Sequence, residues 1–195
     1  MSEFVVTYRG TIYPWQCDHM GHMNVMWYAG KFDEASWHLL ATIGLTSARF
    51  RSEGTGMAAV EQHINYKREL HPGDIVTIRS AVLEVKDKSI RFTHEMRNDE
   101  TGDVAATTVL VGVHLDATAR KARSLPSDVR ERAALMIGEE GDIDRDVLRS
   151  LFATATTPTL SCIVTPSNVE CLTRTAVGLD DDNGEHYRNE GSRPR

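Results

Sequence analysis

Residues 17–24, Cys-Asp-His-Met-Gly-His-Met-Asn, gather several side chains that can do chemistry. Asp18 supplies a carboxylate, and a periodic apolar segment starts directly after Asn24, so the acid stands just before a predicted helix. The first turn of a helix has backbone N–H groups without an acceptor, and these favour negative charge nearby. The spacing therefore predicts a reaction centre in which an acid lies beside a receptor for developing negative charge.

Asp18 has two chemical routes open to it. Its ionised carboxylate can attack an electrophilic carbon directly, or it can act as a general base on water. An aspartate of ordinary pKa is a weak base, unless the apolar side chains of Trp15, Met20 or Met23 desolvate it and raise its pKa.

His19 and His22 give the same loop a second interpretation. Two imidazoles three residues apart, together with Asp18, could bind zinc, but no second well-spaced cluster completes such a site. Hydrogen bonds to the loop backbone, or a part in shaping a substrate pocket, are the alternatives for the two histidines. We therefore expect no metal and no cofactor.

Gly21 suits either an ordinary turn or a close approach of the loop to a substrate.

The elements that must position this loop follow from hydropathy patterns. Asn24 is a suitable N-cap, and apolar residues then recur at intervals of three and four to Ile43, where Gly44 can end the helix. Strand-like segments cover residues 4–12, 58–70, 75–85, 89–97 and 104–115. Turn signals separate the last four, and their short connections imply antiparallel neighbours. The pattern predicts an α+β fold in which the long helix covers the apolar face of an antiparallel sheet.

Composition and charge limit the classes of function. The chain has 195 residues, of which 41% are hydrophobic, and this suits one globular domain plus an appendage. A net charge of −6 argues against nucleic acid as a partner. Three scattered cysteines imply no disulfide framework, and we see neither a signal-peptide pattern nor an apolar run of membrane-spanning length. We expect a cytoplasmic protein that does not bind membranes.

The boundary between domain and appendage is predicted near residue 138. A second, peripheral helix is expected over residues 127–137, so that residues 1–138 form the domain. Residues 139–195 form a C-terminal extension that is poor in large apolar side chains, and we expect it to be partly disordered. Within it, a short helix at 142–152 and edge strands at 162–164 and 176–177 are the candidate elements.

Several motifs together resemble the 4-hydroxybenzoyl-CoA thioesterase-like family of hot-dog proteins. They are Cys17-Asp18-x-x-Gly21, the helix with Tyr28, Phe32, Asp33 and Ala35, then Glu61-x-His63-Ile64-x-Tyr66, Leu70-His71-Pro72-Gly73-Asp74 and the closing segment Arg120-Lys121-x-x-x-Leu125-Pro126. The likeness covers about residues 4–137. It implies a hot-dog fold, in which a five-stranded antiparallel sheet wraps around a long central helix.

The resemblance also implies an activity and an assembly. The expected reaction is hydrolysis of an acyl-CoA thioester, in a homodimer or homotetramer with active sites between subunits. Asp18 matches the family's nucleophile or general base, and the backbone amide of Val25 matches its oxyanion donor. Substrate contacts are expected from the side chains or backbone of Gly21, His22, Asn24, Tyr28 and His63.

Some roles stay open at this point. Glu61 and His63 alternate on one strand, so their side chains share a face. His63 either orients substrate or water, or it is a partly buried histidine that hydrogen-bonds to a neighbouring strand. Glu34 is a rival base, since another branch of hot-dog thioesterases uses a helical glutamate, although a solvated helical acid is the simpler interpretation. Trp15, Trp27 and Trp37 could line a pocket for an aromatic or cationic acyl group, or could pack helix against sheet. The basic residues that could contact CoA phosphates are Lys67, Arg68, Lys88, Arg91, Arg120, Lys121 and Arg123, and the sequence does not choose among them.

Two other functions fit the same fold. A hot-dog hydratase or dehydratase would need a histidine paired with an acid, and release of free thiol separates it from a thioesterase. A non-catalytic acyl-CoA-binding regulatory module would bind without turnover. The Asp18 loop argues against such a module, because a sensor needs no carboxylate at a helix start.

Overall fold

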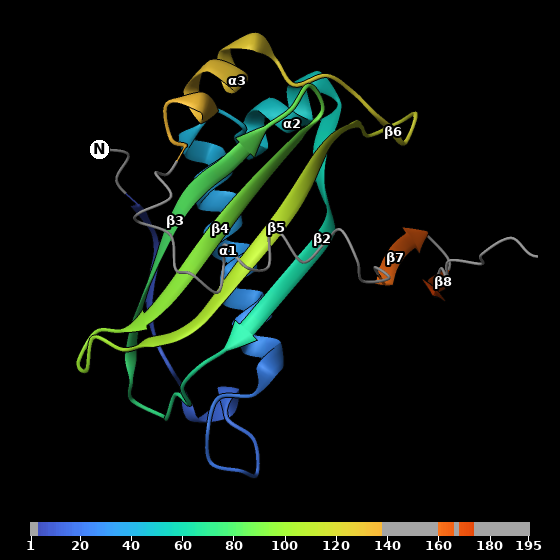
Figure 1. Ribbon diagram of the computed structural model, residues 1–195. Coiled ribbons are helices and arrows are strands. Elements are labelled where there is room, and N and C mark those ends of the chain that lie inside the picture. Colours follow the sequence, from blue (N-terminus) through green and yellow to red (C-terminus); the bar gives the residue numbers. More distant parts are fainter. Residues whose placement is uncertain (1–3, 138–159, 166–167, 174–195) are drawn as a thin grey trace, which may run out of the picture.

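A curled antiparallel sheet forms the body of the structure, a computed structural model that describes residues 4–137, 160–165 and 168–173 (Figure 1). Its strands are β1 (Val5–Thr11), β2 (Thr55–Tyr66), β3 (Ile75–Val85), β4 (Ser89–Asn98), β5 (Val104–Asp116) and β6 (Lys121–Ala122). Their order is β1–β3–β4–β5–β2, with the short β6 beside β5. The sheet curls around one long helix, so the predicted α+β hot-dog architecture is confirmed.

The long helix, α1 (Val25–Thr42), begins and ends as its sequence predicts. The Asn24 side-chain oxygen accepts a hydrogen bond from the Met26 N–H at 3.1 Å, which is an N-cap. After the last turn, Gly44 adopts a φ of +95°, a conformation that favours glycine. The face that α1 turns to the sheet is buried through Tyr28, Phe32, Ala35, Leu39 and Leu40.

Two clusters of buried side chains make up the core beneath α1. One lies toward its C-terminal half and is built around Leu39, Ile43, Phe92 and Val129. The other lies toward its N-terminal half and is built around Tyr28, Phe32, Ile78 and Met96. The start of α1 packs on the second cluster, and this packing fixes the position and direction of the helix N-terminus.

Two short helices, α2 (Ser47–Glu53) and α3 (Ser127–Ala134), cover the end of the sheet that is farther from the start of α1 (Figure 1). A 3-10 turn, η1 (Pro14–Gln16), leads into the loop before α1, while α2 and α3 lie near the C-terminal end of α1. Arg49 of α2 donates to both carboxylate oxygens of Asp128 on α3, at 2.8 and 3.0 Å. The sequence predicts α3 but extends it to residue 137, and it does not predict α2.

Strand β2 differs from its prediction in position. It covers residues 55–66, whereas the pattern predicts 58–70, and it is the last strand at one edge of the sheet. Its last pairing partner on β5 is Ala106, opposite Tyr66. The four residues that follow are therefore a connecting segment, which runs past the start of α1.

Part of the C-terminal extension is described as two paired strands. They are β7 (Leu160–Thr165) and β8 (Asn168–Thr173), which form a separate antiparallel sheet. The first includes the predicted strand at 162–164, and the second is not predicted. The proposed helix at 142–152 and the strand at 176–177 lie outside the described residues. In the described portion of the chain, no helix has the length and apolar character needed to cross a membrane.

Candidate functional site

The loop before α1 is a tight turn held by its own backbone. The Asp18 N–H donates to the His22 carbonyl at 3.1 Å, and the Gly21 N–H donates to the Asp18 carbonyl at 3.0 Å. Gly21 has a φ of +84°, so the turn requires the backbone freedom of glycine at this place. The Met23 N–H donates to the Leu70 carbonyl at 2.7 Å. This bond ties the loop to the segment that follows β2.

The Asp18 carboxylate accepts two hydrogen bonds from its own loop. The backbone N–H of Met20 donates to Oδ1 at 2.9 Å, and the Asn24 amide donates to Oδ2 at 3.0 Å. These two bonds, in that order of importance, hold the pKa of Asp18 below its ordinary value, and the imidazoles of His22 and His19 lower it further. Their effect outweighs desolvation, so the carboxylate is ionised at neutral pH.

The apolar neighbours do not raise the pKa of Asp18 as the sequence suggested they could. The side chains of Trp15 and Met20 are 67% and 68% exposed, so they leave the carboxylate open to water. Met23 is buried in the core beneath α1. Hydrogen bonding, rather than burial, therefore determines the direction in which the pKa of Asp18 shifts.

Asn24 joins the acid to the helix. Its side-chain oxygen caps α1 at the Met26 N–H, while its amide nitrogen holds Asp18. Its backbone carbonyl also accepts from the Trp27 N–H at 3.0 Å. One residue thus fixes the distance and orientation between the carboxylate and the helix terminus.

Val25 is the first residue of α1. Within the part of the chain that the structure describes, its backbone N–H has no hydrogen-bond acceptor. Its side chain is more than half exposed and lines a cavity. The amide is therefore a free donor at the positive end of a helix, as the sequence predicts.

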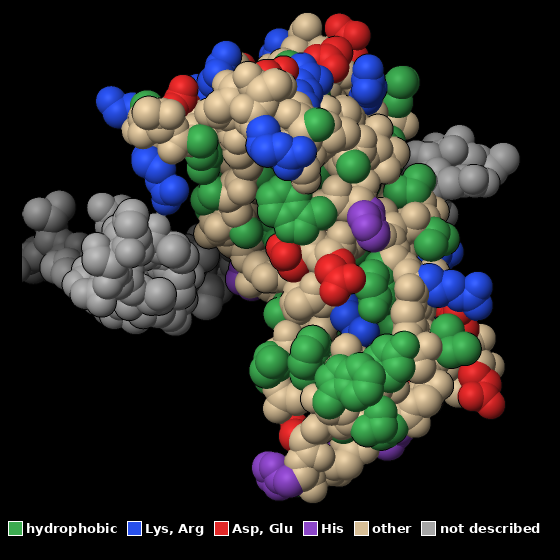
Figure 2. Space-filling view, turned by 180° about the vertical axis from the view of Figure 1, so that it is seen from behind, with side chains coloured by type: hydrophobic (Ala, Val, Ile, Leu, Met, Phe, Trp, Pro, Cys, Tyr) green, Lys and Arg blue, Asp and Glu red, His purple; other side chains and the backbone are tan. Residues whose placement is uncertain are grey.

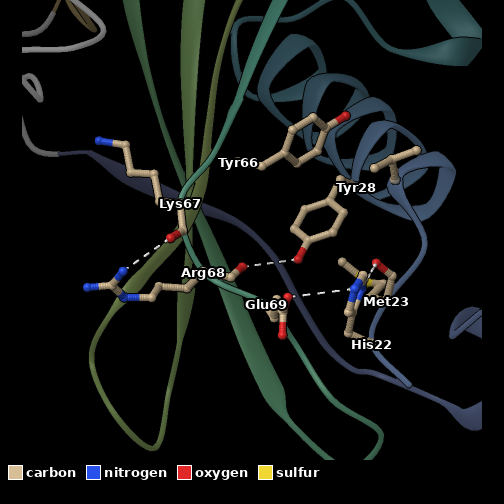
Figure 3. A pocket seen from close by; sticks show the side chains of 8 residues that line it. His22, Met23, Tyr28, Tyr66, Lys67, Arg68 and Glu69 are labelled. Carbon is tan, nitrogen blue, oxygen red and sulfur yellow. Dashed lines mark hydrogen bonds and ion pairs between the residues drawn. The ribbon is translucent and has the colours of Figure 1, made fainter. Parts of the chain in front are cut away.

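The cavity lies between the start of α1 and the connecting segment after β2, and its volume is about 220 Å³ (Figure 3). Its lining residues are His22, Met23, Val25, Tyr28, Tyr66, Lys67, Arg68 and Glu69. Three of these, His22, Val25 and Tyr28, are predicted site residues. The fold brings them to residues that lie about 40 positions later in the chain.

Tyr28 is the most buried polar side chain that lines the cavity. Its hydroxyl donates to the Arg68 carbonyl at 3.2 Å, and its ring packs edge-on against Tyr66 with centroids 5.2 Å apart. Burial, with the nearby charge of Glu69, raises the pKa of Tyr28 to about 12. The phenol therefore stays protonated and keeps its bond to the backbone at neutral pH.

His22 and Glu69, which both line the cavity, face each other (Figure 3). The His22 Nε2 lies 3.7 Å from the Glu69 Oε1, and its Nδ1 lies 3.5 Å from the Met23 carbonyl oxygen. His22 thus joins the loop to the connecting segment and lines the cavity, and its contact with a substrate stays a prediction. In residues 4–137, and in the two strands of the extension, no group of three His, Cys, Asp or Glu side chains is placed to hold a metal ion.

Other residues singled out in the sequence do not line the cavity, and Asp18, Gly21 and Asn24 of the loop before α1 are among them. His63 is exposed and contacts Glu61 at 3.1 Å, so the two share a face as predicted, but neither lines the cavity. Glu34 is exposed on α1 and also does not line it. The tryptophans lie elsewhere too: Trp15 stacks on Tyr13, Trp27 packs against the core, and Trp37 contacts Phe50.

Tyr66 and Glu69 are lining residues to which the sequence assigns no role. The sequence feature that could have indicated Tyr66 is its aromatic side chain at the end of a strand, where it can pack over a neighbouring element. Glu69 gives no local signal. Its place beside His22 depends on the bond between the Met23 N–H and the Leu70 carbonyl, which joins distant segments.

Comparisons with known proteins identify the family of the chain. Residues 12–133 match the thioesterase-like superfamily. A betainyl-CoA thioesterase from Pseudomonas aeruginosa is 25% identical over 132 residues, which are 68% of this chain and 83% of that protein. The L-carnitine dehydrogenase/betainyl-CoA thioesterase of Agrobacterium fabrum is 31% identical over 109 residues, which are 56% of this chain and only 22% of that protein.

Solved structures show the same fold. A gentisyl-coenzyme A thioesterase superposes with a TM-score of 0.57 at 28% identity, over 65% of this chain and 98% of the other. The resemblance predicted from the Asp18 motif is therefore confirmed. Because the matched residues make up well over half of its length, the chain belongs to the thioesterase-like superfamily.

Proposed function

We propose that this protein is an acyl-CoA thioesterase that hydrolyses a CoA thioester to the free acid and CoA. The observation that carries the proposal is the arrangement at the start of α1. There the ionised carboxylate of Asp18 is fixed by Asn24 beside the free backbone amide of Val25. The relatives named as thioesterases support the same reaction.

The geometry suggests how the reaction proceeds. The thioester oxygen accepts a hydrogen bond from the Val25 N–H, and this stabilises the negative charge that develops in the tetrahedral transition state. Asp18 attacks the acyl carbon, or it positions and deprotonates water. The lowered pKa of Asp18 keeps the carboxylate ionised, which is the form that both routes need.

Direct attack gives a balanced sequence of two steps. First, a bond forms between the Asp18 carboxylate and the acyl carbon, the carbon–sulfur bond breaks, and CoA leaves as a thiolate that takes a proton from solvent. Water then hydrolyses the resulting anhydride, which regenerates the carboxylate and releases the acid. Asn24 keeps Asp18 in place during both steps through its bond to Oδ2.

We further propose that the working form is a homodimer. Strand β2 is the edge of the sheet next to the cavity, and Val60 and Tyr66 on it are 47% and 51% exposed. Hydrophobic side chains also gather at the end of the molecule where the loop before α1 lies (Figure 2), and Trp15 and Met26 are among the exposed ones. A second copy of the chain at this edge would cover these side chains and close the cavity.

A panel of acyl-CoA thioesters, with free thiol as the readout, tests the proposal. Betainyl-CoA comes first, because two of the relatives are named for it, and aromatic and straight-chain acyl-CoAs complete the panel. We expect thiol release from at least one member. Hydration of an unsaturated acyl-CoA without thiol release would indicate a hydratase, and tight binding without turnover would indicate a regulatory module.

A further inference from the structure

The part of the cavity beside α1 is an aromatic wall. The rings of Tyr28 and Tyr66 meet at 82° with centroids 5.2 Å apart, and both line the cavity. Tyr28 is 4% exposed, whereas Tyr66 on the strand edge is 51% exposed. Aromatic faces attract cations through the negative potential above the ring, and quaternary ammonium groups are bound by such rings in many proteins.

A carboxylate lies on the same side as these rings. Glu69 approaches His22 and the hydroxyl end of Tyr28, as Figure 3 shows. Its negative charge is one of the reasons that the pKa of Tyr28 is raised, so the acid and the ring share one electrostatic environment. An acid beside aromatic rings is a combination that suits a positively charged group.

The basic side chains that line the cavity point away from the rings. Arg68 turns its guanidinium to the Lys67 carbonyl, where Nη1 donates at 3.4 Å, and both side chains extend to the side opposite Tyr28 and Tyr66 (Figure 3). Positive charge therefore gathers at one end of the cavity and negative charge with aromatic surface at the other. The basic end suits the phosphates of CoA, and the acidic end suits a cationic acyl group.

The distance along α1 from the Val25 amide decides which of two aromatic sites, at Tyr28 or at Trp37, an acyl group can reach. Tyr28 comes three residues after Val25, so it lies about 4.5 Å along the axis from the proposed oxyanion donor. Trp37 and Asp33, whose side chains are hydrogen-bonded at 3.1 Å, also line a cavity, but its volume is about 40 Å³. That site begins eight residues from Val25, about 12 Å along the axis. A short acyl chain reaches the tyrosines and not the tryptophan.

From these observations we infer that Tyr28, Tyr66 and Glu69 select an acyl group that carries a quaternary ammonium close to the thioester. The inference rests on the proposed thioesterase function and adds to it the residues that determine specificity. The trimethylammonium group lies against the two rings, Glu69 balances its charge, and the thioester oxygen stays at the Val25 amide.

Two substrates of equal shape test the role of charge. Betainyl-CoA carries a trimethylammonium group, and 3,3-dimethylbutanoyl-CoA has a carbon atom in place of the nitrogen, so the two differ in charge and hardly in size. We expect the wild-type kcat/KM to be about tenfold or more higher for the charged substrate, which is the scale of a desolvated cation–π contact. Activity is read as free thiol, and circular dichroism checks that each variant is folded.

Variants assign the preference to residues. Glu69→Gln and Tyr66→Leu should each lower the ratio of the two kcat/KM values at least threefold, because one removes the charge and the other the aromatic face. Glu131→Gln, at an exposed position on α3, is the matched control and should leave the ratio as in the wild type.

The outcomes separate the inference from the function on which it rests. If both substrates are hydrolysed with equal kcat/KM, or if the two variants keep the wild-type ratio, the inference is wrong and the thioesterase stands. If only other acyl-CoAs of the panel release thiol, the inference is again wrong. If no acyl-CoA is hydrolysed, the proposed function fails and the inference fails with it.

Discussion

At the scale of single residues, the Asp18 carboxylate is the group on which the proposed reaction depends. Asp18→Asn should lower kcat/KM by about 10² to 10⁴, because an amide is neither a nucleophile nor a base. The circular dichroism spectrum should remain that of the wild type, since the side chain is only partly buried and no core residue changes. Thiol release from the best substrate of the panel is the measurement.

The control for this variant is an aspartate on α1, outside the loop that holds Asp18. Asp33 is exposed on α1 and bonds to Trp37 at 3.1 Å, away from the Val25 amide. Asp33→Asn should retain activity within about twofold of the wild type. Activity of Asp18→Asn within a few-fold of the wild type would remove Asp18 from the mechanism.

In the proposed reaction, Asn24 should set the pH range in which Asp18 is active. The ionised carboxylate is the reactive form, so activity is present above the pKa of Asp18 and is lost as the pH falls through it. Because that pKa is lowered, the acid limb of kcat/KM should lie below the range of an ordinary aspartate. Asn24→Ser keeps a good N-cap but loses the amide donor to Oδ2, so the pKa should rise and the limb should move to higher pH.

A pH–rate profile from pH 3 to pH 8, at conditions where both proteins remain folded by circular dichroism, measures this shift. Asn24→Asp is the stronger variant, since it also caps α1 but places a second negative charge beside Asp18. It should move the limb further than Asn24→Ser does. A limb that stays in place in both variants would contradict the role given to Asn24.

The candidate site could be predicted only where it is local in sequence. Asp18, Asn24 and Val25 lie within eight residues, so capping and helix-start rules place them together. The direction in which the pKa of Asp18 shifts was open, because it depends on which loop N–H groups reach the carboxylate. Glu69 could not be predicted, since long-range pairing of the chain brings it to His22.

At the scale of elements, α1 contacts β1 through a buried lysine. Lys31 is 2% exposed, its Nζ donates to the Tyr8 hydroxyl at 2.9 Å, and the ammonium lies 5.1 Å from the ring centroid. Tyr8→Phe removes the acceptor and should lower the free energy of unfolding by about 1–3 kcal/mol, because a buried donor is left without a partner. Urea unfolding is the measurement.

A second substitution separates the lost bond from lost packing. Lys31→Met replaces the ammonium with an apolar side chain of similar length, so Tyr8→Phe should have little effect in that background. Gly10→Ala provides an independent route to the same loss, since a Cβ there would clash with the Tyr8 hydroxyl and displace the ring. An equal effect of Tyr8→Phe with and without Lys31 would show that the bond contributes nothing.

The elements differ in how well the sequence predicts them, for physical reasons. α1 is long, capped and periodic, so its bounds are correct to within about one residue. α2 has seven residues with Phe50 as its buried side chain, which is too little periodicity to detect. The start of β2 and the strand order β1–β3–β4–β5–β2 depend on pairing between distant segments, which local pattern does not record.

At the scale of the whole molecule, the cavity is open because it lies at the edge of the sheet. One wall comes from α1 and the other from the end of β2 and the residues after it. In the sheet formed by residues 5–122, strand β2 pairs with β5 on one side only, and an edge of this length is normally covered or charged. In the homodimer that we propose, a second copy of the chain would pair at β2, cover this edge and close the cavity.

Charges placed on that edge test whether the dimer is needed for activity. Val60→Lys combined with Gln62→Lys puts two positive charges on exposed positions of β2, and like charges meeting across a two-fold axis should weaken dimerisation at least about tenfold. Light scattering after size exclusion should show a monomer, and kcat/KM should fall in proportion to the loss of dimer. In the wild type, specific activity should fall on dilution below the dissociation constant. A folded monomer with full activity would instead mean that one chain completes the site, and that the cavity binds acyl-CoA without help from a partner.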